Sequence, residues 1–193
     1  MSRQAIALFG GSAPRPGESL YALAYEIGCG LAEAGFDLIN GGHDGTMEAA
    51  SRGARESGAR VTGVTCVAVR QVRGVAANPH VHEVIDVPAL FERIEIMIRR
   101  AAGYVVLPGG TGTLAELALA WEHVSKAFIA PRPIVCVGAA WKPIIDAVSA
   151  AQSGAEGNII WADTPDQVVR IISESAIEVA EHDRNFLPTS AGK

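Results

Sequence analysis

Cysteine is scarce in this chain, and the positions of its cysteines exclude two kinds of site. The three cysteines, Cys29, Cys66 and Cys136, lie far apart and form no C-x-x-C pair. Zinc sites and disulfide frameworks rest on closely or regularly spaced cysteines, so neither is expected. No H-E-x-x-H motif occurs either, and we expect a protein of the reducing cytoplasm without a metal or an organic cofactor.

Clustered positive charge and long apolar runs are lacking as well. The chain has 16 Lys and Arg residues against 21 Asp and Glu residues, a net charge of −5, and no basic stripe of the kind that nucleic-acid-binding proteins carry. Its apolar runs are short and interrupted, and its first residues do not read as a signal peptide. The sequence therefore predicts neither a nucleic-acid partner nor a membrane location.

Apolar residues and glycine, by contrast, are abundant. Apolar residues make up 49% of the 193 residues, charged residues 19%, and 21 residues are glycine. This length and composition suit one sizeable core and leave little room for a second. We expect a single domain over residues 1–180, followed by a polar C-terminal tail over residues 181–193.

Short apolar segments alternate with amphipathic ones along the whole domain. Strands are predicted at Ala5–Phe9, Phe36–Asn40, Val61–Thr65, Val81–Val87, Tyr104–Leu107, Ile134–Val137 and Ile159–Trp161. Helices are predicted at residues 18–34, 46–57, 88–102, 114–128, 141–150 and 165–176, and a long irregular loop at residues 66–80. This alternation predicts an α/β fold with a doubly wound, Rossmann-like parallel sheet of about seven strands and helices on both faces.

Three of the predicted strands run directly into double-glycine loops. In such folds ligands bind beyond the carboxyl ends of the strands, where free backbone N–H groups at a helix start can hold a phosphate. A single glycine pair could equally be a tight turn, but three at one edge favour a binding site. The candidate phosphate- or nucleotide-binding residues are Gly11, Ser12, Gly41, Gly42, Gly45, Pro108, Gly109, Gly110, Thr111, Gly112 and Thr113.

Two common classes of nucleotide-binding protein are disfavoured. No lysine follows any of the glycine loops, as the phosphate loop of nucleoside triphosphatases requires. No G-x-G-x-x-G follows the first strand, and the second strand ends at Asn40 rather than at an acidic residue, which disfavours a nicotinamide dehydrogenase.

The third loop carries the most specific pattern. The run Pro108-Gly-Gly-Thr-Gly-Thr-Leu-Ala-Glu116 resembles the P-G-G-x-G-T-x-x-E signature of the Lonely Guy (LOG) family of nucleotide 5′-monophosphate phosphoribohydrolases. The run from Gly41 to Met47 is similar to that family's G-G-G-x-x-G-L-M segment, and Arg93 and Met97 match the arginine and methionine of its R-K-x-x-M helix. Three positions depart from the family pattern: His43 replaces a glycine, Ile94 a lysine and Leu119 an acidic residue.

The resemblance implies hydrolysis of the N-glycosidic bond of AMP or a related 5′-monophosphate. It implies that Glu116 stabilises the cationic sugar or activates water, that Arg93 positions the phosphoribosyl group, and that Met97 lies at the binding site. It also implies a homodimer. A related branch, the molybdenum-cofactor carriers, implies the alternative of a carrier without hydrolysis, and an oligomeric nucleotide sensor is a third hypothesis.

Each of these residues also has a structural interpretation. Thr113 and Glu116 form a capping-box pattern at a predicted helix start, where the helix dipole would keep Glu116 ionised. Arg93 has no acidic partner on its own helix and could be solvated, while Met97 could lie in the core. His43, and Arg70 and Arg73 of the 66–80 loop, could contact a ligand or simply be loop residues.

Overall fold

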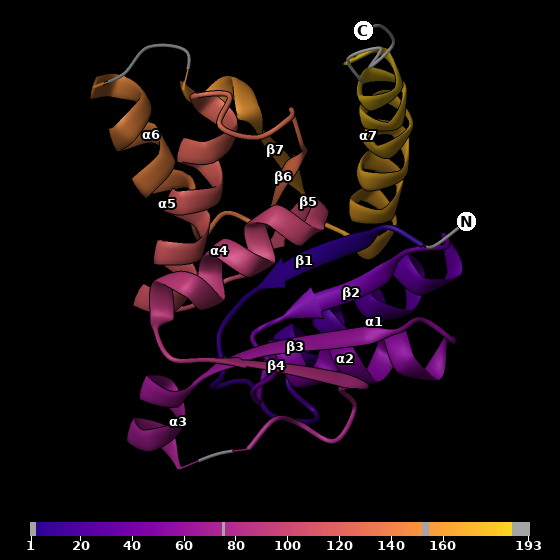
Figure 1. Cartoon of the computed structure of the whole chain (residues 1–193), viewed down its shortest axis with the longest axis vertical. Coiled ribbons are helices and arrows are strands. Elements are labelled where there is room, and N and C mark those ends of the chain that lie inside the picture. Colours follow the sequence, from indigo (N-terminus) through magenta and orange to yellow (C-terminus); the bar gives the residue numbers. More distant parts are fainter. Residues whose placement is uncertain (1–2, 75, 152–154, 187–193) are drawn as a thin grey trace, which may run out of the picture.

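The strands form one seven-stranded sheet in which every pairing is parallel (Figure 1). The computed structural model describes residues 3–74, 76–151 and 155–186. The sheet order is β4-β3-β2-β1-β5-β6-β7. The strands are β1 (Ala5–Phe9), β2 (Asp37–Asn40), β3 (Val61–Cys66), β4 (Glu83–Val87), β5 (Ala101–Val106), β6 (Ile134–Val137) and β7 (Ile159–Ala162).

Helices cover both faces of this sheet. They are α1 (Ser19–Glu33), α2 (Thr46–Glu56), α3 (Val67–Arg73), α4 (Leu90–Arg100), α5 (Thr111–Ser125), α6 (Lys142–Ala151) and α7 (Pro165–Phe186), with a 3-10 turn, η1, at Ala155–Asn158. Figure 1 shows α1 and α2 on one side of the strands and α4 and α5 on the other. No helix within the described residues is long and apolar enough to cross a membrane.

The core is split into two clusters because successive side chains of a strand point to opposite faces. In β1, Ile6 and Leu8 pack with α1, α2 and α7, whereas Ala7 and Phe9 pack with α4, α5 and α6. The predicted α/β fold with a parallel sheet is therefore confirmed. The chain reverses its direction of growth across the sheet between β1 and β5, which places the switch point at the ends of these two strands.

Several predicted bounds differ from the structure: β5 begins at Ala101, within the predicted helix 88–102, and α5 spans Thr111–Ser125 rather than 114–128. Two further segments differ in kind. Residues 66–80 are not one irregular loop: β3 extends to Cys66 by pairing with Val87, and α3 follows directly. Gly74 ends this helix in a left-handed conformation (φ 67°), which glycine adopts without strain. At the other end of the chain, α7 continues past the predicted end at Ala176 to Phe186, so part of the predicted tail is helical, and residues 187–193 lie outside the described part.

Candidate functional site

The three glycine loops meet at the carboxyl edge of the sheet, beside the switch point. The amide of Gly11 donates a hydrogen bond to the carbonyl of Pro108 (3.1 Å), and the amide and hydroxyl of Thr46 both donate to the carbonyl of Gly11 (3.0 Å each). The loop after β1 is thus bonded to the loop after β5 and to the start of α2. A cavity of about 600 Å³ opens between these loops.

Most of the predicted site residues line this cavity. Those that do are Gly11, Ser12, Arg93, Glu116 and the six residues 108–113. Gly41, Gly42 and Gly45 do not line it. A side chain at Gly45 would run into the backbone of Gly11 and Ser12, so this glycine allows two of the loops to touch.

The start of α5 provides free backbone donors in the cavity. Gly110 is the N-cap residue and has no side-chain capping bond, and the glycines at 109, 110 and 112 are exposed. The predicted capping box is wrong: the helix begins at Thr111, so Thr113 is inside its first turn and Glu116 lies beyond that turn. The first amides of α5 therefore remain available to an anion.

Arg93 and Glu116 form a buried ion pair at the base of this cavity. Nη1 of Arg93 donates to Oε1 of Glu116 (3.1 Å), Nε of Arg93 donates to the carbonyl of Val64 (2.8 Å), and both side chains are only 7% exposed. The guanidinium packs directly against the α-carbon of Gly41, where a side chain would collide with it. The alternative of a solvated Arg93 is wrong, because its acidic partner lies on α5 rather than on its own helix.

Burial changes the acidity of Glu116. Loss of solvation raises the pKa of Glu116 to about 7, and the neighbouring Arg93 opposes this rise. The expectation that the helix dipole keeps this carboxyl ionised is therefore wrong, because Glu116 lies too far into the helix and is buried.

Other candidate residues fall into different environments. Met97 is fully buried in the core with Ile94 and Ile98, and it does not line the cavity. His43 is 3% exposed and does line it. The side chains of Arg70 and Arg73 lie outside the described part of the structure.

Four large apolar side chains of the lining were not named as site residues in the sequence analysis. They are Leu20, Met47, Val69 and Leu90, which come from four different helices. Leu20 and Leu90 look like ordinary core residues of amphipathic segments, and Val69 lies in the stretch that was predicted to be a loop. Met47 alone had a signal that could have found it, because it is the methionine of the segment similar to G-G-G-x-x-G-L-M. Within the described residues, no group of three or more His, Cys, Asp or Glu side chains could hold a metal ion.

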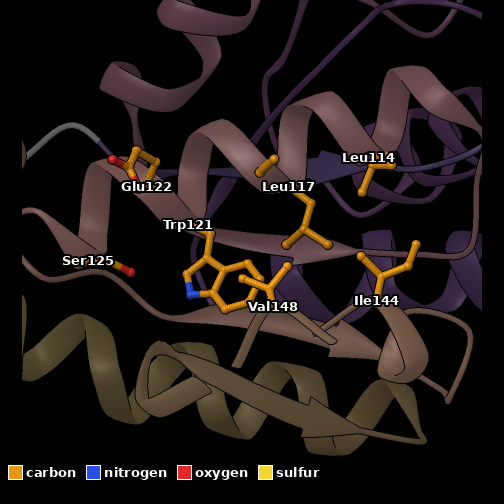
Figure 2. Close-up of a pocket in the computed structure, with 8 residues that line it drawn as sticks. Leu114, Leu117, Trp121, Glu122, Ser125, Ile144 and Val148 are labelled. Atoms are coloured by element: carbon orange, nitrogen blue, oxygen red, sulfur yellow. The ribbon is translucent and has the colours of Figure 1, made fainter. Parts of the chain in front are cut away.

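A second, smaller cavity lies apart from the glycine loops. It has a volume of about 180 Å³, and Figure 2 shows Leu117 and Trp121 of α5 facing Ile144 and Val148 of α6 across it. None of the predicted site residues lines it.

Glycine loops at the switch point of a parallel sheet, above a buried arginine–glutamate pair, define a Rossmann-like α/β protein with a candidate anion site. The chain belongs to the SLOG cluster4 family, whose family model matches residues 3–169. The resemblance found in the sequence is confirmed by relatives that carry the phosphoribohydrolase name.

Two curated relatives give the extent of this similarity. A cytokinin riboside 5′-monophosphate phosphoribohydrolase of Mycobacterium tuberculosis is 36% identical over 117 residues, which cover 60% of this chain and 61% of the relative. A pyrimidine/purine nucleotide 5′-monophosphate nucleosidase of Escherichia coli is 32% identical over 119 residues, covering 58% of this chain and 25% of the relative. The chain thus spans less than two thirds of the length of either relative.

A solved structure shows how far the fold is shared. The molybdenum cofactor carrier protein of Chlamydomonas reinhardtii superposes with a TM-score of 0.70, covering 91% of this chain and 99% of the carrier. At 22% sequence identity this likeness concerns the fold alone.

Proposed function

We propose that the protein hydrolyses the N-glycosidic bond of a nucleoside 5′-monophosphate, AMP or a related nucleotide, to a free base and ribose 5-phosphate. The observation that carries this proposal is the buried Arg93–Glu116 pair, which lines the same cavity as the glycine loops. The names of the relatives from Mycobacterium tuberculosis and Escherichia coli support the same reaction class.

The glycine-rich start of α5 is suited to hold the 5′-phosphate. Its exposed glycines let an anion approach the free amides between Gly110 and Thr113, and the positive end of the helix dipole favours negative charge there. Ser12 lines the same cavity and adds a hydroxyl group. A phosphate held at this point leaves the sugar and the base to extend along the cavity toward Arg93 and Glu116.

Glu116 and Arg93 are suited to the chemical step. As the bond between C1′ and the base nitrogen breaks, positive charge builds on the ribose, and a nearby carboxylate stabilises it. Ionised Glu116 then takes a proton from the water whose oxygen bonds to C1′, while the base leaves with the bonding electron pair and takes up a proton from solvent; Glu116 later returns its proton to solvent. Arg93 holds the carboxylate in place and binds the phosphoribosyl group.

The reaction is tested by replacing the carboxylate without changing its shape. Glu116→Gln should lower base release from a panel of 5′-monophosphates by at least about a hundredfold while nucleotide binding survives. Glu122→Gln is the matched control, because Glu122 lies on the same helix but outside this cavity, and it should keep full activity. Equal activity of the native protein and Glu116→Gln would contradict the assigned role.

A carrier for a phosphate-bearing ligand is the second candidate. The exposed glycine loop can bind a phosphate without any chemistry, and the fold is shared with a molybdenum cofactor carrier over nearly the whole chain. A carrier would bind its ligand equally well before and after the Glu116→Gln substitution and would release no base from any nucleotide.

We further propose that the protein is a cytoplasmic homodimer. Phe91, at the start of α4, is 74% exposed, and it follows Leu90, which lines the cavity. A second copy packed on this end of α4 would cover an apolar surface next to the site. Sedimentation equilibrium measures the assembly, and a monomer at all concentrations would contradict it.

A further inference from the structure

The turn that follows β2 is held firmly from its own side of the sheet. Oδ1 of Asn40 accepts a hydrogen bond from the amide of Gly42 (2.8 Å). Its Nδ2 donates to the hydroxyl of Ser51 (2.9 Å) and to the carbonyl of Met47 (3.2 Å) in α2. Asn40 is fully buried, so these bonds fix the start of the turn.

A second asparagine holds the same turn from the opposite side. The amide of Asn78 donates to the carbonyl of Gly42 (2.8 Å), and its Nδ2 donates to the carbonyl of His43 (3.0 Å). Its Oδ1 accepts from the amide of His80 (3.1 Å), which fixes the orientation of the side chain. Asn78 is 6% exposed and comes from the segment between α3 and β4.

These bonds determine where the side chain of His43 lies. Gly42 has a left-handed backbone (φ 71°), and hydrogen bonds on both of its sides stabilise that conformation. With the carbonyls of Gly42 and His43 both bonded, the peptide planes on either side of His43 cannot rotate freely. The His43 side chain is thereby kept in the cavity wall.

The sheet order places His43 at the far end of the cavity from the start of α5. The loop that leads into α5 follows β5, and His43 follows β2, with β1 between them. Two strand spacings amount to roughly 10 Å, about the distance from the phosphate to the base in a nucleotide. Val69 and Leu90 line the same cavity and add apolar surface suited to a flat ring.

We propose that His43 is the contact for the nucleotide's base and that Asn78 is the positioning residue that holds His43 there. This inference rests on the proposed nucleotide site, with the phosphate at the start of α5. It assigns the two ends of the cavity to the two ends of the ligand, and it gives the segment between α3 and β4 a role in binding.

The proposal is tested by comparing two ligands that differ only by the base. Binding of AMP and of ribose 5-phosphate is measured by calorimetry in a Glu116→Gln background, where AMP is not consumed. Asn78→Asp keeps the acceptor for His80 but removes the donor to His43, and His43→Ala removes the ring while keeping the turn. Each should weaken AMP binding by about tenfold and leave ribose 5-phosphate binding unchanged.

Two further variants separate positioning from a general loss of structure. If Asn78 acts through His43, the double variant binds AMP no more weakly than His43→Ala alone. Asn158→Ala removes a comparable side-chain bond, to the hydroxyl of Ser125, away from this cavity and should bind both ligands normally. Thermal melting of each variant checks that it is folded, and His43→Ala tests the base contact even if Asn78→Asp does not fold.

Several results would overturn the assignment of His43 and Asn78. Equal losses for AMP and ribose 5-phosphate, unchanged AMP binding, or effects that multiply in the double variant would overturn the inference, as would no AMP binding at all. Failure of the proposed reaction looks different: AMP binds and responds to these variants, but the native protein releases no base.

Discussion

At the scale of single residues, the unusual feature is a charged pair buried beneath an open cavity. Arg93 and Glu116 lose most of their hydration, and their mutual bond and the bond from Arg93 to the carbonyl of Val64 offset part of that cost. Such a pair contributes little net stability compared with apolar residues, but removing one member leaves the other charge unpaired. A buried charged pair whose desolvation is only partly offset is typical of a functional site.

Removal of the Arg93 side chain should therefore be costly. We expect Arg93→Ala to lower the free energy of unfolding in urea by about 3 kcal/mol, because Glu116 and the carbonyl of Val64 both lose their partner. Arg52→Ala is the matched control, since Arg52 makes a solvent-exposed ion pair with Glu56, and it should change stability little. If both substitutions lowered the free energy of unfolding by the same amount, losing the buried ion pair would cost no more than losing an exposed one, which would contradict this prediction.

At the scale of secondary-structure elements, the start of α5 is the part of the cavity lining best suited to an anion. The helix is entered through glycines and capped by none of its side chains, so its first turn keeps unsatisfied amides. This arrangement lowers the stability of the helix end and leaves amides that an anion could bind.

A substitution at Gly112 should raise the stability of the helix end and weaken anion binding at the same time. A β-carbon at this position would meet no atom within 4 Å. Gly112→Ala should therefore stabilise the protein by about 0.5 kcal/mol, because alanine is the better helix former. The added methyl group takes up space in the cavity lining, so binding of ribose 5-phosphate should weaken by about tenfold. If neither the stability nor the binding of ribose 5-phosphate changed, Gly112 would not be part of the binding site.

The same element shows what sequence could and could not reveal. The run from Pro108 to Glu116 predicted a binding loop at a helix start, but it did not reveal which residue begins the helix. Since the helix starts at Thr111, the Thr113–Glu116 spacing that looked like a capping box has another role. The seven-residue helix α3 was missed because a segment this short has too few residues to show a helical period.

At the scale of the whole molecule, the site exists only because distant segments meet. The alternation of strands and helices predicted a parallel sheet, but not that β5 inserts beside β1 and brings the third loop next to the first. The Arg93–Glu116 pair joins two helices across this arrangement, and local spacing contains no information about it. The apolar cavity wall was unpredictable for the same reason.

The free energy of unfolding of the whole protein should depend on pH through the protonation of Glu116. Its pKa is raised to about 7 in the folded chain, above the ordinary value of 4.5, so the folded state binds the proton more tightly than the unfolded state. The stabilisation from this group is complete below about pH 4.5 and is lost as the pH rises through about 7. Melting temperatures of Glu116→Gln minus those of the native protein should therefore increase between about pH 5 and about pH 8. A constant or decreasing difference would contradict the raised pKa.

The central claim is that this cavity cleaves the bond between ribose 5-phosphate and a base. The most direct measurement is the product balance after incubation of the native protein with AMP and other 5′-monophosphates, beside Glu116→Gln. The account predicts free base and ribose 5-phosphate in equal amounts from at least one nucleotide, with both products lost in the variant. Free phosphate with an intact nucleoside, or binding without any base release, would contradict it.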